Sequence, residues 1–121
     1  MIEQYAGPIL IVTGTLTALI GTGFLIPRLL LRIVLGLETP DPTTVMIARH
    51  WTLVVGLIGG LLIYAGYHPE VRVPVMIAGA AEKLALGALV IASPLRRRLV
   101  TMLVVCADAT MAVLYLLLLA R

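Results

Sequence analysis

The sequence predicts an all-α integral membrane protein, a four-helix bundle with up-down connectivity. Of its 121 residues, 61% are hydrophobic and only 12% are charged. The charged share of a soluble domain is about 25%, so most of this surface is suited to lipid rather than water. The apolar residues form four runs, each long enough for a transmembrane helix of about 20 residues. We therefore expect residues 1–121 to form a single transmembrane domain in a lipid bilayer.

The first two helices are expected at about residues 6–35 and 42–67. The first run carries no charge before Pro27, and the residues ahead of it lack the basic segment of a signal peptide, so we expect a retained helix. Pro27 disturbs this helix, and the residues after it are typical of an amphipathic tail at the membrane interface. Asp41 and Pro42 are favoured at the N-cap and the first position of a helix, so they mark the start of the second helix.

The third and fourth helices are expected at about residues 73–92 and 99–120, after short turns. Glycines on the first two helices mark faces that another helix can approach closely. The approaching helix can belong to the same chain or to a second copy in a homodimer, and the pattern leaves both open. These glycines are Gly7, Gly14 and Gly21, and Gly56, Gly59 and Gly60.

The arginines indicate how the chain is oriented. Basic residues gather on the cytoplasmic side of multi-pass proteins, which favours the inner (cytoplasmic) membrane with both termini outside. No basic stripe with interleaved aromatic residues is present, so we expect no nucleic-acid partner. One predicted side holds Arg28, Arg32, Arg49, Arg96, Arg97 and Arg98, whereas the other holds Arg72 and Arg121.

Four ionisable residues lie inside the expected spans. Glu82 and Lys83 fall near the middle of the third helix, Asp108 near the middle of the fourth, and Arg49 about two turns into the second. A charge at the bilayer centre costs about 2.5–3.5 kcal/mol on insertion scales, so these residues need partners. We expect Asp108, Glu82 and Arg49 to meet in the bundle interior.

Two interpretations of these residues stay open. They can form a buried polar network that only fixes helix register, or they can line a cavity that binds or transforms a lipophilic molecule. Apolar surroundings favour a protonated carboxyl group, which suits a general acid, whereas a nearby cation keeps a second carboxyl ionised as a base. We expect Glu82 and Asp108 to be this catalytic pair. Arg49 is the expected electrostatic partner, and His50, Lys83 and Tyr115 are the expected supporting groups.

No spacing of histidine, cysteine and carboxylate residues suggests a metal, and no glycine-rich loop with lysine suggests a nucleotide. We therefore expect neither a metal nor another cofactor.

The motifs point to one family. The chain resembles small bacterial four-helix membrane proteins of the DoxX-like type over most of its length. The resemblance rests on residues 23–27 (Gly-Phe-Leu-Ile-Pro), 48–51 (Ala-Arg-His-Trp), the glycine-rich 55–60, 81–87 (Ala-Glu-Lys-Leu-Ala-Leu-Gly), and Asp108 followed by Tyr115.

The resemblance also suggests a chemistry. The wider set of such bundles is similar to membrane sterol isomerases and membrane terpene cyclases, which use intramembrane acids on apolar substrates. It implies Glu82 and Asp108 as catalytic residues for isomerising or cyclising a terpenoid-, sterol- or quinone-like molecule. Other DoxX-like proteins look like accessory subunits or assembly factors. A non-catalytic subunit of a larger membrane complex is therefore our second hypothesis, and a small proton-coupled transporter is the third.

Overall fold

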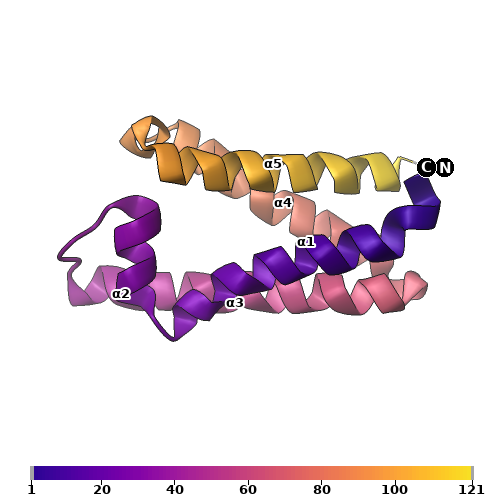
Figure 1. The fold of residues 1–121 in the computed structure, drawn as a ribbon, viewed down its shortest axis with the longest axis horizontal. Coiled ribbons are helices and arrows are strands. Elements are labelled where there is room, and N and C mark those ends of the chain that lie inside the picture. Colours follow the sequence, from indigo (N-terminus) through magenta and orange to yellow (C-terminus); the bar gives the residue numbers. More distant parts are fainter. Residues whose placement is uncertain (1, 121) are drawn as a thin grey trace.

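The computed structural model describes residues 2–120, and in that range it contains helices and no β-strand. Four helical spans are long and apolar enough to cross a membrane, with mean hydropathy of 1.5 to 2.3. Successive long helices run in opposite directions and are joined by short connections (Figure 1). The predicted all-α bundle with up-down connectivity is confirmed, and the chain has the make-up of a multi-pass membrane protein. The long helices are α1 (Ala6–Gly21), α3 (Pro42–Tyr67), α4 (Arg72–Ile91) and α5 (Leu99–Leu119).

The helix expected over residues 6–35 is broken into several pieces. Helix α1 ends at Gly21, and the backbone at Ile26 leaves the helical region, with φ −134° and ψ 57°. Pro27 restricts the residue before it to extended conformations and starts a new helix, which turns away from α1 (Figure 1). The pieces after α1 are η2 (Thr22–Phe24), α2 (Pro27–Leu30) and a π-helical turn, η3 (Leu31–Leu35).

Helices α1 and α3 pack through their glycines. A Cβ atom placed on Gly21 would lie 2.4 Å from the Cα of Gly56, and one on Gly14 would lie 2.8 Å from the carbonyl oxygen of Gly59. Such short distances leave no room for side chains, so the two backbones are nearly in contact. Gly60 has nothing within 4 Å and belongs to no such contact. The predicted glycine faces therefore serve internal packing, with Gly60 as the exception.

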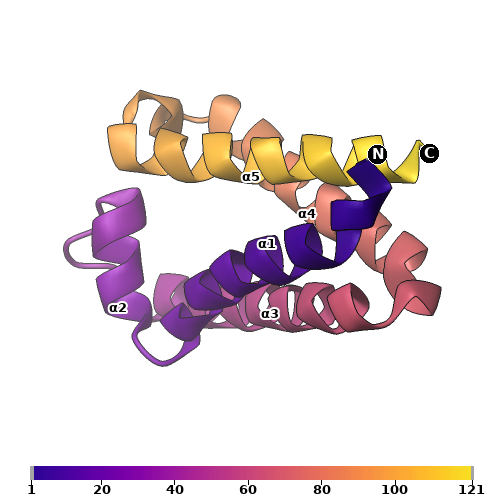
Figure 2. The same ribbon diagram turned by 45° about the vertical axis from the view of Figure 1, so that its right-hand side comes forward.

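Helices α4 and α5 form the second closely packed pair. The two pairs approach each other at the end where the termini lie, and they separate toward the end that holds α2 (Figures 1 and 2). A short turn, η4 (Pro69–Val71), joins α3 to α4 at the closed end, and η5 (Pro94–Arg97) joins α4 to α5 at the open end. Much of the buried core lies between the pairs and comprises Ala6, Leu10, Leu62, Ala65, Met76, Ala80, Met111, Ala112, Tyr115 and Leu118.

Two arginines hold these connections. The Arg98 guanidinium donates to three carbonyl oxygens of residues 32–34 at 2.9–3.2 Å, which ties the start of α5 to the end of η3. At the other end, Arg72 donates to the carbonyl oxygens of Ala65 and Gly66 at 2.8 and 2.9 Å. Carbonyl groups at helix C-termini lack intrahelical partners, and both arginines supply donors to such groups.

Candidate intramembrane binding site

Lys83 is the centre of the polar site. Its side chain comes from the middle of α4 and is almost fully buried, with the residue 2% exposed. The ammonium Nζ lies 3.2 Å from Asp108 Oδ1 on α5 and donates to Thr17 Oγ1 on α1 at 2.8 Å. Glu82 Oε1 is its third neighbour, at 4.0 Å. One lysine thus connects the α4–α5 pair to the α1–α3 pair with charge-assisted hydrogen bonds.

The hydroxyl groups around Lys83 extend this connection along α1. Thr17 accepts from Lys83 and donates to the carbonyl oxygen of Thr13 at 2.8 Å. Tyr115, which is fully buried on α5, donates to Thr13 Oγ1 at 2.6 Å. Thr13 in turn donates to the carbonyl oxygen of Ile9 at 2.7 Å. Both threonine hydroxyls donate to backbone carbonyl oxygens of α1, so the row fixes the register of α1 against α5 and is not a continuous proton path.

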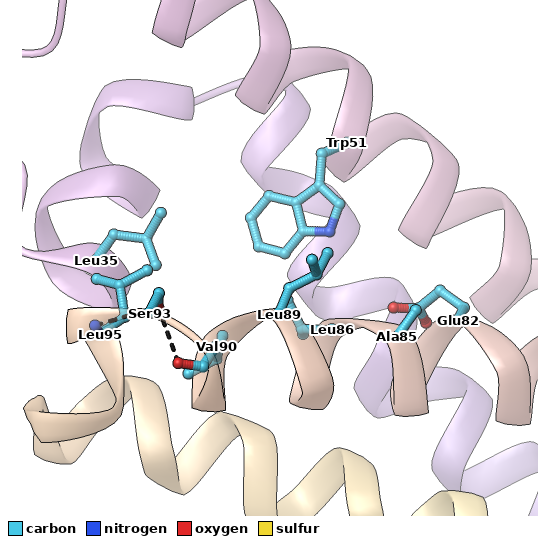
Figure 3. A pocket seen from close by; sticks show the side chains of 9 residues that line it. All are labelled: Leu35, Trp51, Glu82, Ala85, Leu86, Leu89, Val90, Ser93 and Leu95. Atoms are coloured by element: carbon cyan, nitrogen blue, oxygen red, sulfur yellow. Dashed lines mark hydrogen bonds between the residues drawn. The ribbon is translucent and has the colours of Figure 1, made fainter.

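Glu82 differs from its neighbours in having no close partner. Its Oε1 atom is shielded, yet it accepts no hydrogen bond from any of residues 2–120. A buried oxygen atom without a hydrogen-bond donor costs free energy of folding, unless a bound molecule supplies the donor. Glu82 also lines a pocket of about 460 Å³ between α3 and α4, at the end where the helix pairs separate (Figure 3).

The walls of this pocket are otherwise almost entirely apolar. The Trp51 indole on α3 lies across from α4, and Glu82 occupies the inner end of the row of α4 side chains (Figure 3). At the other end, Ser93 donates its hydroxyl to the Val90 carbonyl oxygen at 2.8 Å. Among the lining residues Glu82 is the one that can exchange a proton. The full lining is Leu35, Trp51, Glu82, Ala85, Leu86, Leu89, Val90, Ser93 and Leu95.

A much smaller cavity continues inward from the same carboxyl group. Lys83 and Asp108 line it together with Thr17, and it shares Glu82 and Trp51 with the larger pocket. Its volume of about 10 Å³ is at the lower limit for one ordered water. Asp108 therefore forms the ion pair with Lys83 and lines this small cavity, but it does not line the larger pocket.

Arg49 and His50 lie outside this site, contrary to the prediction. Both are exposed on α3, and the Arg49 guanidinium lies 5.9 Å from the ring centroid of Phe24. The buried side of α3 is made instead by small residues such as Ala48 and Thr52, each less than 5% exposed. Arg49 is thus not the partner of the carboxyl groups, and Lys83 has that position.

Tyr115 also differs from its expected place. It was expected to be a supporting group of the site, but it lines neither of the two cavities that Glu82 lines. Its ring is packed in the core between the helix pairs, and its hydroxyl is used by Thr13. Its position is that of a structural contact.

Two contributors to the site were missed in the sequence. Thr17 was not considered, although Thr13 and Thr17 lie one turn apart on a helix without charges, which places two hydroxyls on one face. Trp51 was noted only as part of the 48–51 motif and not as a site residue, yet it lines both cavities. The signal for Trp51 was its position on the same helix face as Val55, another residue that lines the small cavity.

Comparisons with family models, with curated proteins and with solved structures returned no match. The resemblance to DoxX-like proteins therefore stays a prediction, and the function has to be inferred from the residues of this chain.

Proposed function

We propose that the chain binds a lipophilic small molecule in the pocket between α3 and α4 and acts on it by acid–base chemistry at Glu82. The supporting observation is the position of this carboxyl group at the inner end of an apolar pocket of about 460 Å³. Small-molecule sites are usually clefts of about 300–1,000 Å³ with mostly apolar walls and few polar groups. Intramembrane carboxyl groups without a close partner are costly and mark functional positions.

The proposed chemistry needs one group that takes and returns a proton. The Glu82 carboxylate takes a proton from a carbon next to a double bond in the bound molecule, and the carboxyl group so formed returns it to the far carbon of that double bond. The double bond has then moved, and Glu82 is a carboxylate again. Asp108 acts in this proposal through Lys83, since the pair fixes a positive charge 4.0 Å from Glu82.

The second candidate is a non-catalytic accessory or assembly subunit, held together by the same polar residues. It is supported by the hydrogen bonds of Lys83 to Asp108 and Thr17, which join the two helix pairs. A buried polar network of this kind can serve only to fix how the helices pack. In this alternative the partner is a second copy or a larger membrane protein.

Mass spectrometry of small molecules retained after gentle detergent purification separates the two candidates. Wild type should retain a specific lipophile that is lost in Glu82→Gln, whereas the exposed variant Arg49→Gln should retain it. Helix content by circular dichroism checks that each variant is folded. If wild type, Glu82→Gln and Arg49→Gln carry the same bulk lipids and nothing else, the pocket has no specific ligand. That result would favour the non-catalytic subunit.

We also propose that the chain lies in the inner (cytoplasmic) membrane with both termini outside. The support is that the two connections rich in arginine lie at one end of the bundle, tied together by Arg98, and that such residues favour the cytoplasmic side. A C-terminal reporter that fluoresces only in the cytoplasm should stay dark. Fluorescence of this fusion would contradict the proposed orientation and place the C-terminus in the cytoplasm.

A further inference from the structure

We infer that the ligand is a lipophilic cation, an apolar body with one ammonium-type group that lies against Glu82. This inference rests on the proposed function and adds the chemical class of the molecule. It follows from the charges of the site, from the aromatic residue beside Glu82 and from the walls of the pocket.

The charges of the site do not balance. Counted as ionised, Asp108 and Glu82 bring two negative charges, and Lys83 brings one positive charge. Lys83 is engaged by Asp108 at 3.2 Å and by Thr17 at 2.8 Å, while Glu82 lies at 4.0 Å. Arg49, which was expected to meet these carboxyl groups, is exposed and lies near Phe24 instead. One carboxylate is therefore left for a cation from outside.

The pocket beside Glu82 has the walls that an organic cation needs. A tryptophan face is the best aromatic partner for a cation, and an ammonium group gains most there when it has lost its water. Trp51 lines both cavities that Glu82 lines. The rest of the wall is aliphatic, with Leu86 and Leu89 on α4 (Figure 3). Such a wall excludes a strongly hydrated inorganic ion and favours a weakly hydrated ammonium group on an apolar chain.

A neutral lipophile with one hydroxyl group is the competing occupant, because its hydroxyl could also donate a hydrogen bond to the Glu82 carboxyl group. The charge count decides against it. A hydroxyl satisfies the hydrogen-bond acceptor but leaves the second negative charge in the apolar span, where an uncompensated charge is expensive.

The single tryptophan of the chain, Trp51, reports directly on the pocket. The protein is placed in nanodiscs of zwitterionic phosphatidylcholine and titrated with dodecyltrimethylammonium or with dodecanol, which has the same chain and no charge. Each affinity is expressed per probe dissolved in the bilayer, measured with protein-free nanodiscs. We expect the ammonium probe to change the Trp51 fluorescence with an affinity at least about tenfold higher than dodecanol, a preference within the range of desolvated cation contacts.

Two variants test the origin of this preference. Glu82→Gln keeps the shape and removes the charge, so it should bind both probes alike. Glu70→Gln changes an exposed carboxyl group in the turn at the opposite end of α4, and it should keep the wild-type preference. The wild-type comparison alone still decides the matter where Glu82→Gln fails to fold.

The outcomes separate the two proposals. Equal affinity of wild type for both probes overturns the cation inference and leaves a pocket for neutral lipophiles. A preference that persists in folded Glu82→Gln overturns it as well, since the charge would then come from elsewhere. If neither probe changes the fluorescence, the pocket binds no lipophile, and the proposed function fails together with the inference.

Discussion

Removing the counterion of Lys83 should destabilise the bundle strongly. In Asp108→Leu the Lys83 Nζ loses its partner at 3.2 Å and keeps Thr17 at 2.8 Å and Glu82 at 4.0 Å. Breaking a buried ion pair by removing one member costs about 3–5 kcal/mol, because the other charge stays buried. Lys83 is 2% exposed, but Glu82 remains near it, so we expect the lower end, about 3 kcal/mol of the free energy of unfolding.

Removing both charges should restore much of this loss. In the double variant Lys83→Met with Asp108→Leu, no buried ammonium group is left without its carboxylate, and apolar replacements of buried ion pairs are often neutral. We expect the double variant to be at least about 2 kcal/mol more stable than Asp108→Leu alone. The assay is reversible unfolding in mixed micelles of mild detergent and dodecyl sulfate, followed by circular dichroism.

A neighbouring variant provides the control for this cycle. Thr110→Val changes a hydroxyl group that is exposed on α5 and bonds only to the carbonyl oxygen of Cys106, and it should be nearly neutral. A double variant less stable than Asp108→Leu would refute the reasoning, because Lys83 would then stabilise the bundle without its carboxylate.

Three smaller predictions follow from contacts elsewhere in the chain. Gly21→Ala should lower the free energy of unfolding by about 1–3 kcal/mol, since its Cβ would lie 2.4 Å from a glycine Cα on α3. Gly60→Ala should be neutral, because nothing lies within 4 Å of a Cβ at that position. Equal melting temperatures of the two variants would contradict the packing of α1 against α3. Tyr115→Phe should cost about 0.5–1.5 kcal/mol in the same unfolding assay through its lost bond to α1, and an unchanged melt would show that the bond adds nothing. Asp41 accepts a hydrogen bond from Thr44, which lowers the pKa of its carboxyl group from 3.8. The ionised carboxylate therefore stabilises the fold at pH values above 3.8, and this stabilisation is lost as the pH falls through the lowered pKa of the folded protein. A pH titration of stability should therefore be flatter at acid pH in Asp41→Asn than in wild type, and identical curves would exclude this contribution.

Most of the fold could be predicted because membrane spans are governed by length and hydropathy. The helix expected over residues 42–67 begins and ends where α3 does, at Pro42 and Tyr67. The helix expected over residues 6–35 failed in its second half, since hydropathy continues across Pro27 while the backbone does not. A hydropathy pattern reports which segments suit lipid, but it does not report local breaks.

The candidate site was harder to predict because it depends on how each helix is rotated about its axis. Glu82, Lys83 and Asp108 were recognised, since charges inside spans are costly wherever they point. Arg49 was assigned to the interior on the same argument. However, its helix packs through small residues on another face, and the long arginine side chain lies near Phe24 at the exposed side.

The partner on α1 was not predictable from charge at all. Thr17 is an uncharged residue in an apolar helix, and it enters the site through its hydrogen bond from Lys83 on α4, while Gly14 and Gly21 of the same helix pack against α3. Hydrogen bonds between helices of this kind depend on contacts across about 66 residues of sequence, which a local pattern does not contain.

The central claim, that Glu82 lines the large pocket between α3 and α4 and Asp108 does not, can be tested by chemical modification. Dicyclohexylcarbodiimide is a lipid-soluble reagent that attaches to carboxyl groups reached from the membrane. After treatment of the protein in bilayers, peptide mass spectrometry should find the adduct mainly on Glu82, with much less on Asp108, which is paired with Lys83, and no adduct at position 82 of Glu82→Gln. Modification of Asp108 to the same extent, or of neither residue, would contradict the claim.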